Sequence, residues 1–226
     1  MTEPIESTAG EYFGARVAEY DALIRACVPR YDEMLERLVG YLPPAPAAIL
    51  ELGTGTGNLA SAVAARFPDA ALTLVDAAPE MLELAGQRLP GASRVVSRFE
   101  GLAMPEGSFD LITSAISLHH VEDKAALYAR LFAALRPGGA LVFADQLMGR
   151  TPDLHGVNWE AWLAHCRAPG NCTEEQTRSF LDHAAAHDHY TPLEEHFDLL
   201  RAAGFVELDC VWRNWIWGII HARRPA

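Results

Sequence analysis

The chain contains few cysteines and few basic residues, and it has no long apolar run. Its 226 residues include 4 cysteines, and no two of them form a C-x-x-C pair. Lysine and arginine number 18 against 30 aspartates and glutamates, which gives a net charge of −12. Such a charge opposes binding to phosphate backbones, so a nucleic-acid partner is not favoured. No run approaches the roughly 18 apolar residues of a membrane span, so no membrane partner is expected.

The start of the chain carries no visible export signal. Residues 1–10 are polar and acidic and lack a charged start followed by an apolar stretch. We therefore expect a cytoplasmic protein with reduced thiols. Half of the residues are hydrophobic (50%), which suffices for one α/β domain with a sizeable core.

A glycine-rich loop is the most informative feature. The apolar run 48–52 leads into Gly53, Gly55 and Gly57, and a helical pattern follows. This order of strand, tight turn and helix is how an open α/β sheet builds a nucleotide pocket. The spacing G-x-G-x-G differs from the dinucleotide fingerprint G-x-G-x-x-G. The carboxylate of Glu51, just before the loop, would repel a pyrophosphate but suit a cationic amino-acid ligand.

Segments with strand and helix patterns alternate after this loop. A strand over 71–75 ends at Asp76, about twenty residues after the glycines, where a ribose diol would be bound. Further strands are expected at 94–97, 109–114 and 140–144, with helices at 79–85 and 123–135. The alternation predicts βαβ units and a parallel sheet.

Five motifs in this order are similar to those of a known family. They are Glu51–Gly57, Asp76, Glu100, Phe109–Ile112 and Leu135–Gly139. Together they resemble the motifs of class I S-adenosylmethionine (SAM) dependent methyltransferases. The resemblance implies an α/β, Rossmann-like, mostly parallel seven-stranded sheet with helices on both faces, whose last two strands form an antiparallel hairpin.

The same resemblance implies SAM as the cofactor and gives roles to several positions. The glycine loop would lie under the methionine part, Asp76 would bind the ribose, and Glu100 with its neighbours would bind the adenine. The segment Ser114–Ser117 would close over the sulfonium. The expected cofactor-binding residues are Glu51, Gly53, Thr54, Gly55, Gly57, Asp76, Ala77, Met81, Phe99, Glu100, Gly101, Ser114 and Ser117.

A narrower resemblance extends beyond these motifs. The segments Phe13–Tyr20, Thr177–Leu181 and Trp215–Gly218 look like parts of the carboxy-SAM synthases. In that family the arginine at the position of Arg178 holds the extra carboxylate of the modified SAM. The glycine loop here has the ordinary methyltransferase form, so we interpret the likeness as relatedness of fold and lid.

The segments outside the core are expected to form a helical lid. Residues 1–45 are predicted to be an amino-terminal lid, with two amphipathic helices broken near Pro29. Residues 46–226 are predicted to be the SAM-binding domain, with a helical insertion at about 148–190. Insertions at the carboxyl ends of strands lie over the ligand crevice and can exclude water. A homodimer is a further expectation.

No catalytic residue stands out, and the weak candidates are Tyr20, His119 and Arg178. Arg178 could bind a carboxylate of a ligand, or pair with Glu174 or Asp182 on its own helix. The spacing of His183 and His187 can ligate a metal, but a solvated helix face is the better interpretation, and no metal is predicted. Trp215 and Trp217 are expected to share one face of the last strand in the core.

The function predicted is SAM-dependent methyl transfer to a small-molecule acceptor, by displacement at the methyl carbon. Alignment and desolvation would supply much of the acceleration. A hydroxyl, amine, carboxylate or thiol acceptor all stay open. The alternatives are a SAM-using enzyme without methyl transfer, such as a carboxy-SAM synthase or a cyclase acting on the methionine part, and a non-catalytic SAM-binding module. An RNA methyltransferase is disfavoured by charge.

Overall fold

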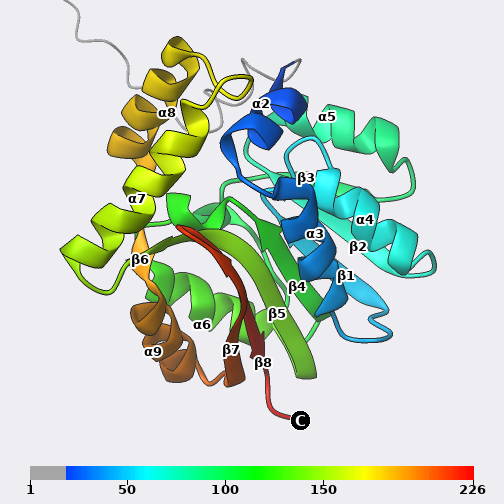
Figure 1. Cartoon of the computed structure of the whole chain (residues 1–226). Coiled ribbons are helices and arrows are strands. Elements are labelled where there is room, and N and C mark those ends of the chain that lie inside the picture. The colour runs from blue at the N-terminus through cyan, green and yellow to red at the C-terminus, as the bar shows by residue number, and fades with distance from the viewer. Residues whose placement is uncertain (1–18) are drawn as a thin grey trace, which may run out of the picture.

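A computed structural model describes residues 19–226, and its centre is a mostly parallel sheet (Figure 1). The strands lie in the order β3-β2-β1-β4-β5-β8-β7, and β8 is antiparallel to both of its neighbours. Their bounds are β1 Ala48–Leu52, β2 Ala71–Asp76, β3 Ser93–Val96, β4 Phe109–Ala115, β5 Leu135–Met148, β7 Val206–Asn214 and β8 Trp217–Arg223. A short β6, Thr191–Pro192, pairs with the end of β5. The predicted fold class and terminal hairpin are confirmed.

Helices cover both faces of this sheet (Figure 1). Their bounds are α2 Tyr20–Cys27, α3 Tyr31–Gly40, α4 Asn58–Arg66, α5 Pro79–Arg88, α6 Lys124–Ala134, α7 Pro152–Cys166, α8 Glu174–His187 and α9 Leu193–Ala203. Two short 3₁₀ turns, η1 Phe99–Gly101 and η2 Leu118–His120, follow β3 and β4. Among the described residues, no helix is long and apolar enough to cross a membrane.

The alternation of side chains along β1 divides the core into two layers. Ile49 packs into a cluster with residues of α3, α4 and α7, whereas Leu50 and Leu52 pack into a cluster with α6 and α9. Successive side chains of a strand point to opposite faces, which explains the division. Because α3 buries Met34 and Leu38 completely in the first layer, it belongs to the sheet's own helical cover. Among the described amino-terminal helices, the prediction of a lid therefore rests on α2 and stays a prediction.

The predicted insertion forms the helices α7 and α8 between β5 and β6. α7 begins at Pro152, where the Thr151 side chain caps its first turn. Thr173 and Gln176 form a reciprocal capping box at the start of α8. The buried indole N–H of Trp162 on α7 donates to the carbonyl of Cys27 at 2.8 Å. This bond ties the insertion to the end of α2.

The tryptophans near the carboxyl end do not alternate along one strand, so that expectation was wrong. Trp215 lies in the turn between β7 and β8 with a φ of 54°, and 37% of it is exposed. Trp217, the first residue of β8, is buried in the core as predicted. The part of the carboxy-SAM synthase likeness at Phe13–Tyr20 lies almost wholly outside the described residues.

Candidate functional site

Neighbouring residues pack closely against the backbone of the glycine loop on two sides. Gly53 and Gly57 have positive φ angles of 64° and 89°, a region that favours glycine. A Cβ added to Gly53 would lie 2.3 Å from the side chain of Ser117. A Cβ added to Gly57 would lie 3.2 Å from Ala85 on α5. The loop therefore uses glycine because the chain after β4 and helix α5 both approach its backbone.

Asp76 at the end of β2 is bound to this loop. Its carboxylate accepts hydrogen bonds from the backbone N–H of Gly55 at 2.7 Å and of Ala78 at 2.9 Å. Burial raises the pKa of Asp76, and these two N–H groups oppose the rise. The structure thus brings together the loop and the acid predicted to bind the ribose. Met81 on α5 is buried, and Ala77 is exposed.

The segment after β4 closes the other side of the loop. The hydroxyls of Ser114 and Ser117 lie 2.6 Å apart, and both donate to the carbonyl of Leu52. Between them Ile116 has a φ of 59°, an uncommon conformation for a β-branched residue. Strain of this kind gathers at functional sites. Ser114 is fully buried, so Ser117 is the hydroxyl nearer the surface.

The 3₁₀ turn η1 lies beside the same loop. A Cβ at Gly53 would lie 3.5 Å from the ring of Phe99, and the guanidinium of Arg130 on α6 donates to the carbonyls of Phe99 and Leu102. Glu100 and Gly101 are exposed within this turn. Four segments distant in sequence therefore meet at the carboxyl ends of β1, β2, β3 and β4, which is where ligands bind in open α/β sheets.

Glu51 lies deeper than the strand-end pattern indicated. It is 1% exposed, and burial raises the pKa of its carboxyl to about 8. The backbone N–H of Ala60, in the first turn of α4, partly offsets this rise, and the charge of Asp76 adds to it. Thr54 is also buried in the loop. Glu51 is therefore buried beneath the glycine loop, and it would influence a bound ligand only indirectly, by positioning that loop.

Helix α2 lies over the loop. A Cβ on Gly55 would come within 3.7 Å of the ring of Tyr20. The next residue, Asp21, accepts hydrogen bonds from Thr56, from Asn58 and from Arg88 on α5. Tyr20 is thereby placed beside the loop, and burial raises the pKa of its phenol well above the usual value.

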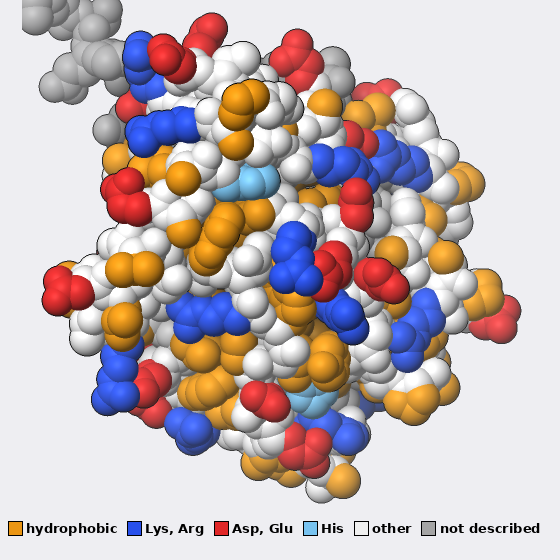
Figure 2. Space-filling view, viewed as in Figure 1, with side chains coloured by type: hydrophobic (Ala, Val, Ile, Leu, Met, Phe, Trp, Pro, Cys, Tyr) orange, Lys and Arg blue, Asp and Glu red, His pale blue; other side chains and the backbone are white. Residues whose placement is uncertain are grey.

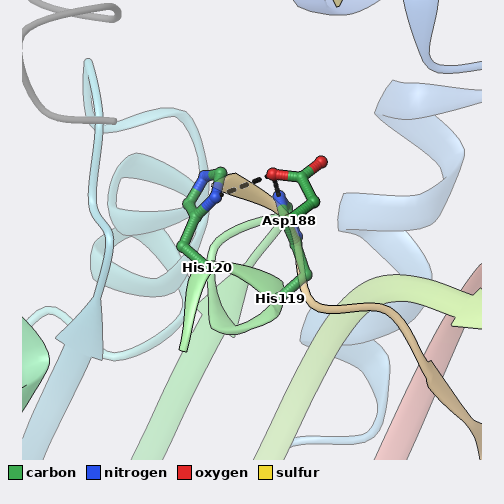
Figure 3. A group of neighbouring side chains, drawn as sticks. All are labelled: His119, His120 and Asp188. Atoms are coloured by element: carbon green, nitrogen blue, oxygen red, sulfur yellow. Dashed lines mark ion pairs between the residues drawn. The ribbon is translucent and has the colours of Figure 1, made fainter. Parts of the chain in front are cut away.

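A cluster of histidines and carboxylates lies next to Ser117, where η2 meets the chain after α8 (Figure 3). His119 donates through Nδ1 to Asp145 on β5 at 2.5 Å. The Oδ1 of Asp188 lies 3.0 Å from His120 Nδ1 and 3.6 Å from His119 Nε2. Burial opposes a charge on His119, but the carboxylates of Asp145 and Asp188 outweigh burial and raise its pKa.

The solvated helix face expected for His183 and its neighbours is wrong. His183 is buried at 8% exposure, and its Nε2 lies 3.8 Å from Asp188 Oδ1. The side chain of Asp188 is 3% exposed, so it is not a surface residue. The sequence pattern missed this because the rings of η2, far away in the chain, cover this end of α8.

Arg178 is exposed on α8, away from the histidine cluster's ion pairs. In the described part of the chain, no ion pair joins Arg178 to Glu174 or Asp182, so that alternative is not realised. Arg178 and Arg167 instead line a pocket of about 400 Å³ beside Cys172. A second pocket of about 240 Å³ opens at the amino-terminal ends of β1 and β2, on the side opposite the glycine loop.

Asp21, Asp145 and Asp188 were missed by the sequence analysis. Asp145 could have been found, because it comes directly after the strand expected at 140–144, as Asp76 comes directly after the one expected at 71–75. Asp188 gives no such signal, since it lies after a long inserted helix. Its position is set by Tyr190, whose hydroxyl donates to Asp188 at 2.6 Å, and by the N–H of His189, which donates to the carbonyl of His119.

Comparisons with known proteins agree with this geometry. The methyltransferase domain family matches residues 49–139. The chain is 33% identical over 144 residues to malonyl-[acyl-carrier protein] O-methyltransferase of Methylococcus capsulatus, covering 62% of this chain and 52% of the relative. It is 32% identical over 178 residues to trans-aconitate 2-methyltransferase of Acidovorax sp., covering 75% of this chain and 65% of the relative.

The fold has solved counterparts. Phosphoethanolamine N-methyltransferase 2 of Haemonchus contortus, in complex with S-adenosyl-L-methionine, superposes with a TM-score of 0.70 at 15% identity. The match covers 100% of this chain and 62% of that one. The chain spans about half the length of the first curated relative it matches, and less than two thirds of the others described here. The likeness to carboxy-SAM synthases is not confirmed by these comparisons and stays a prediction.

Proposed function

The core of this chain belongs to the class I SAM-dependent methyltransferase family, and from that premise we propose that the protein transfers a methyl group from SAM to a small-molecule acceptor. One observation carries the proposal. The glycine loop, Asp76, η1 and Ser117 meet at the carboxyl ends of the first four strands, with Gly55 bonded to Asp76. This is the crevice in which open α/β sheets bind nucleotides.

The residues present fit the cofactor. Gly55 leaves space at the loop, since a Cβ there would meet nothing closer than Tyr20 at 3.7 Å, and Asp76 keeps acceptor capacity beside its bonds to Gly55 and Ala78. Phe99 and Glu100 would lie along the adenine, and Ser117 near the sulfur. SAM, when bound, supplies a methyl group on a positively charged sulfur. The other expected contacts, including Glu51, Thr54, Ala77, Met81, Gly101 and Ser114, stay predictions.

The protein's own contribution would be alignment and exclusion of water. Helix α2 lies over the glycine loop through Tyr20, and α8 packs against the histidine cluster through His183. A covered site strengthens every electrostatic interaction within it and holds the reacting atoms in line. We propose α2 and the insertion as the lid. Tyr20 and His119 are retained as candidates for contact with the acceptor, because each lies beside the proposed crevice.

A small acceptor is favoured over RNA. On the face drawn in Figure 2, lysine and arginine are interspersed with acidic and hydrophobic side chains instead of forming one basic surface. The net charge of −12 acts in the same direction. The relatives named above carry names of enzymes that act on malonyl-acyl carrier protein and on aconitate. The nature of the acceptor atom and a homodimer stay open proposals.

The test is incubation with SAM labelled in the methyl group and in the nucleoside, together with fractionated metabolite extracts. S-adenosylhomocysteine and a labelled metabolite are expected. Methylthioadenosine would instead indicate a cyclase, and carboxy-SAM would indicate a synthase. If calorimetry shows SAM binding but no extract gives turnover, the chain is a SAM-binding module and the proposed activity is wrong.

A further inference from the structure

Three imidazole rings surround one oxygen atom of Asp188. The distances from Asp188 Oδ1 are 3.0 Å to His120 Nδ1, 3.6 Å to His119 Nε2 and 3.8 Å to His183 Nε2. The donor atoms of His119, His120 and Asp188 all lie within 4.8 Å of one another. In Figure 3 dashed lines join one oxygen of this carboxylate to both rings of η2. Side chains from two distant segments therefore converge on one point.

This spacing is close to that of a transition-metal centre. An ion about 2.1 Å from each nitrogen and oxygen separates its donors by roughly 3 to 4 Å. Closing the widest gap by roughly 1 Å brings all of the donors onto one ion. Two or three imidazoles with one carboxylate are a ligand set that suits zinc, iron and nickel more than magnesium or calcium.

The surroundings of the cluster orient its donors. Asp145 accepts from His119 Nδ1 at 2.5 Å, which leaves His119 Nε2 directed at Asp188. Tyr190 donates to Asp188 Oδ2 at 2.6 Å, which leaves Oδ1 toward the rings. Oδ1 itself is buried and has no hydrogen bond of good geometry in the described structure. Carboxylates and hydroxyls behind the ligands, oriented in this way, are typical of protein metal sites.

The backbone of both segments is fixed as well. The N–H of His189 donates to the carbonyl of His119 at 2.8 Å. The ammonium of Lys124 donates to the carbonyls of Val121 and His189, at 2.8 Å and 2.5 Å. These bonds join η2 to the chain after α8 on either side of the cluster. The donors therefore do not need to be gathered from mobile loops.

We propose that His119, His120 and Asp188, with His183 as a fourth donor, bind one divalent transition-metal ion of the zinc class. The site stands on these side chains alone and does not depend on the proposed methyl transfer. The pair that the sequence suggested, His183 with His187, is not the site, because only His183 faces Asp188. The competing occupant of the cluster is a proton on His119, held by Asp145 and Asp188.

The test uses the full chain, stripped with chelator and then loaded with Zn²⁺ or Co²⁺. After desalting, elemental analysis is expected to give about one metal per chain, and Co²⁺ to give a visible absorption band of a nitrogen-ligated ion. Asp188→Asn and His120→Ala are expected to lower retained metal about tenfold or more. His187→Ala, on the same helix as His183, and His221→Ala, on β8, are the controls that should retain it.

Two results overturn the proposal. The first is wild-type protein that retains almost no Zn²⁺ and shows no Co²⁺ band, which leaves the cluster as a protonated ion network. The second is metal that survives Asp188→Asn or disappears with His187→Ala. Circular dichroism on each variant identifies any loss of fold. The Co²⁺ band of the wild type tests the site even where a variant does not fold. The two proposals can fail separately. Metal binding without methyl transfer would contradict only the proposed function, and methyl transfer without metal binding would contradict only the metal site.

Discussion

The carboxylate of Asp21 accepts a hydrogen bond from the hydroxyl of Thr56 at 2.5 Å, which joins α2 to the glycine loop. The same carboxylate also binds Asn58 and Arg88. One side chain thus connects the proposed lid, the start of α4 and the end of α5. The position of Tyr20 over the loop depends on this connection, because Tyr20 directly precedes Asp21 on α2.

Replacing Asp21 should loosen the lid and the loop together. We expect Asp21→Asn to weaken SAM binding about three- to tenfold, which is less than the roughly 1.5 to 3 kcal/mol of a hydrogen bond to a charged group, because Asp21 acts on the ligand only through the loop and Tyr20. Asp32→Asn is the matched control, because Asp32 forms an exposed ion pair with Arg25. That control should cost no more than a few tenths of a kcal/mol. Equal SAM affinities in calorimetry for both variants would contradict the role of Asp21.

Asp76 offers a direct test of ribose binding. Asp76→Ala should weaken SAM binding by about 1.5 to 3 kcal/mol, and it should also lower the melting temperature, because Gly55 and Ala78 lose their acceptor. Comparing S-adenosylhomocysteine with its 2′-deoxy form separates the two effects. The wild type should prefer the hydroxylated ligand, and the variant should not. Asp69→Ala, an exposed acid before β2, should leave both affinities unchanged.

Substitutions at two glycines with similar φ angles can separate the cost of backbone strain from the cost of a steric clash. Gly53 has a φ of 64° and Gly107 a φ of 57°, but only Gly53 has a neighbour at 2.3 Å, whereas a Cβ on Gly107 would meet nothing within 4 Å. Alanine should cost about 1 kcal/mol at either position from the backbone angle. Gly53→Ala should in addition displace Ser117 and abolish SAM binding. Urea unfolding and calorimetry on the pair would reject this account if both variants behaved alike.

Glu51 predicts a dependence of stability on pH. Its pKa in the folded protein is about 8, above the value of about 4.3 for an exposed glutamate. The folded state therefore holds the proton more tightly, so this stabilisation is complete below pH 4 and is lost as pH rises toward 8. The loss reaches at most about 1.4 kcal/mol per pH unit. Urea midpoints from pH 5 to pH 8.5 should fall less steeply in Glu51→Gln; parallel curves would refute the raised pKa.

Variants of Arg178 can distinguish methyl transfer from SAM from the alternative activity of a carboxy-SAM synthase. If it holds a carboxylate, Arg178→Lys should be impaired, because lysine lacks the planar fork of donors. Binding of SAM and of carboxy-SAM should be compared in the wild type, in Arg178→Lys and in Arg178→Ala, with Arg150→Ala as an exposed control. We expect no preference for carboxy-SAM. A wild-type preference that disappears in the Arg178 variants would overturn the methyltransferase proposal.

The meeting of the glycine loop with Asp76 was predictable, because its signals are local. Glycines after a strand and an acid after the next strand fix both turns and their meeting at one sheet edge. The histidine half was not predictable, because Asp188 reaches His119 and His120 only through the packing of an inserted helix. The prediction for Trp215 was wrong for a related reason. Its positive φ places it in a turn, and the alternation of residues along a strand does not reveal that turn.

The buried hydrogen bond from Trp162 to the carbonyl of Cys27 has a consequence for turnover. A second ring on α7, His165, bonds the carbonyl of Ala26 at 3.1 Å, so α2 and α7 are fastened at adjacent residues. Neither helix can swing outward without breaking these contacts, and a buried partner left unpaired costs about 1 to 3 kcal/mol. Departure of the spent nucleoside and departure of the methylated product would then share one opening event. If that opening is slower than the displacement at carbon, its rate constant sets kcat.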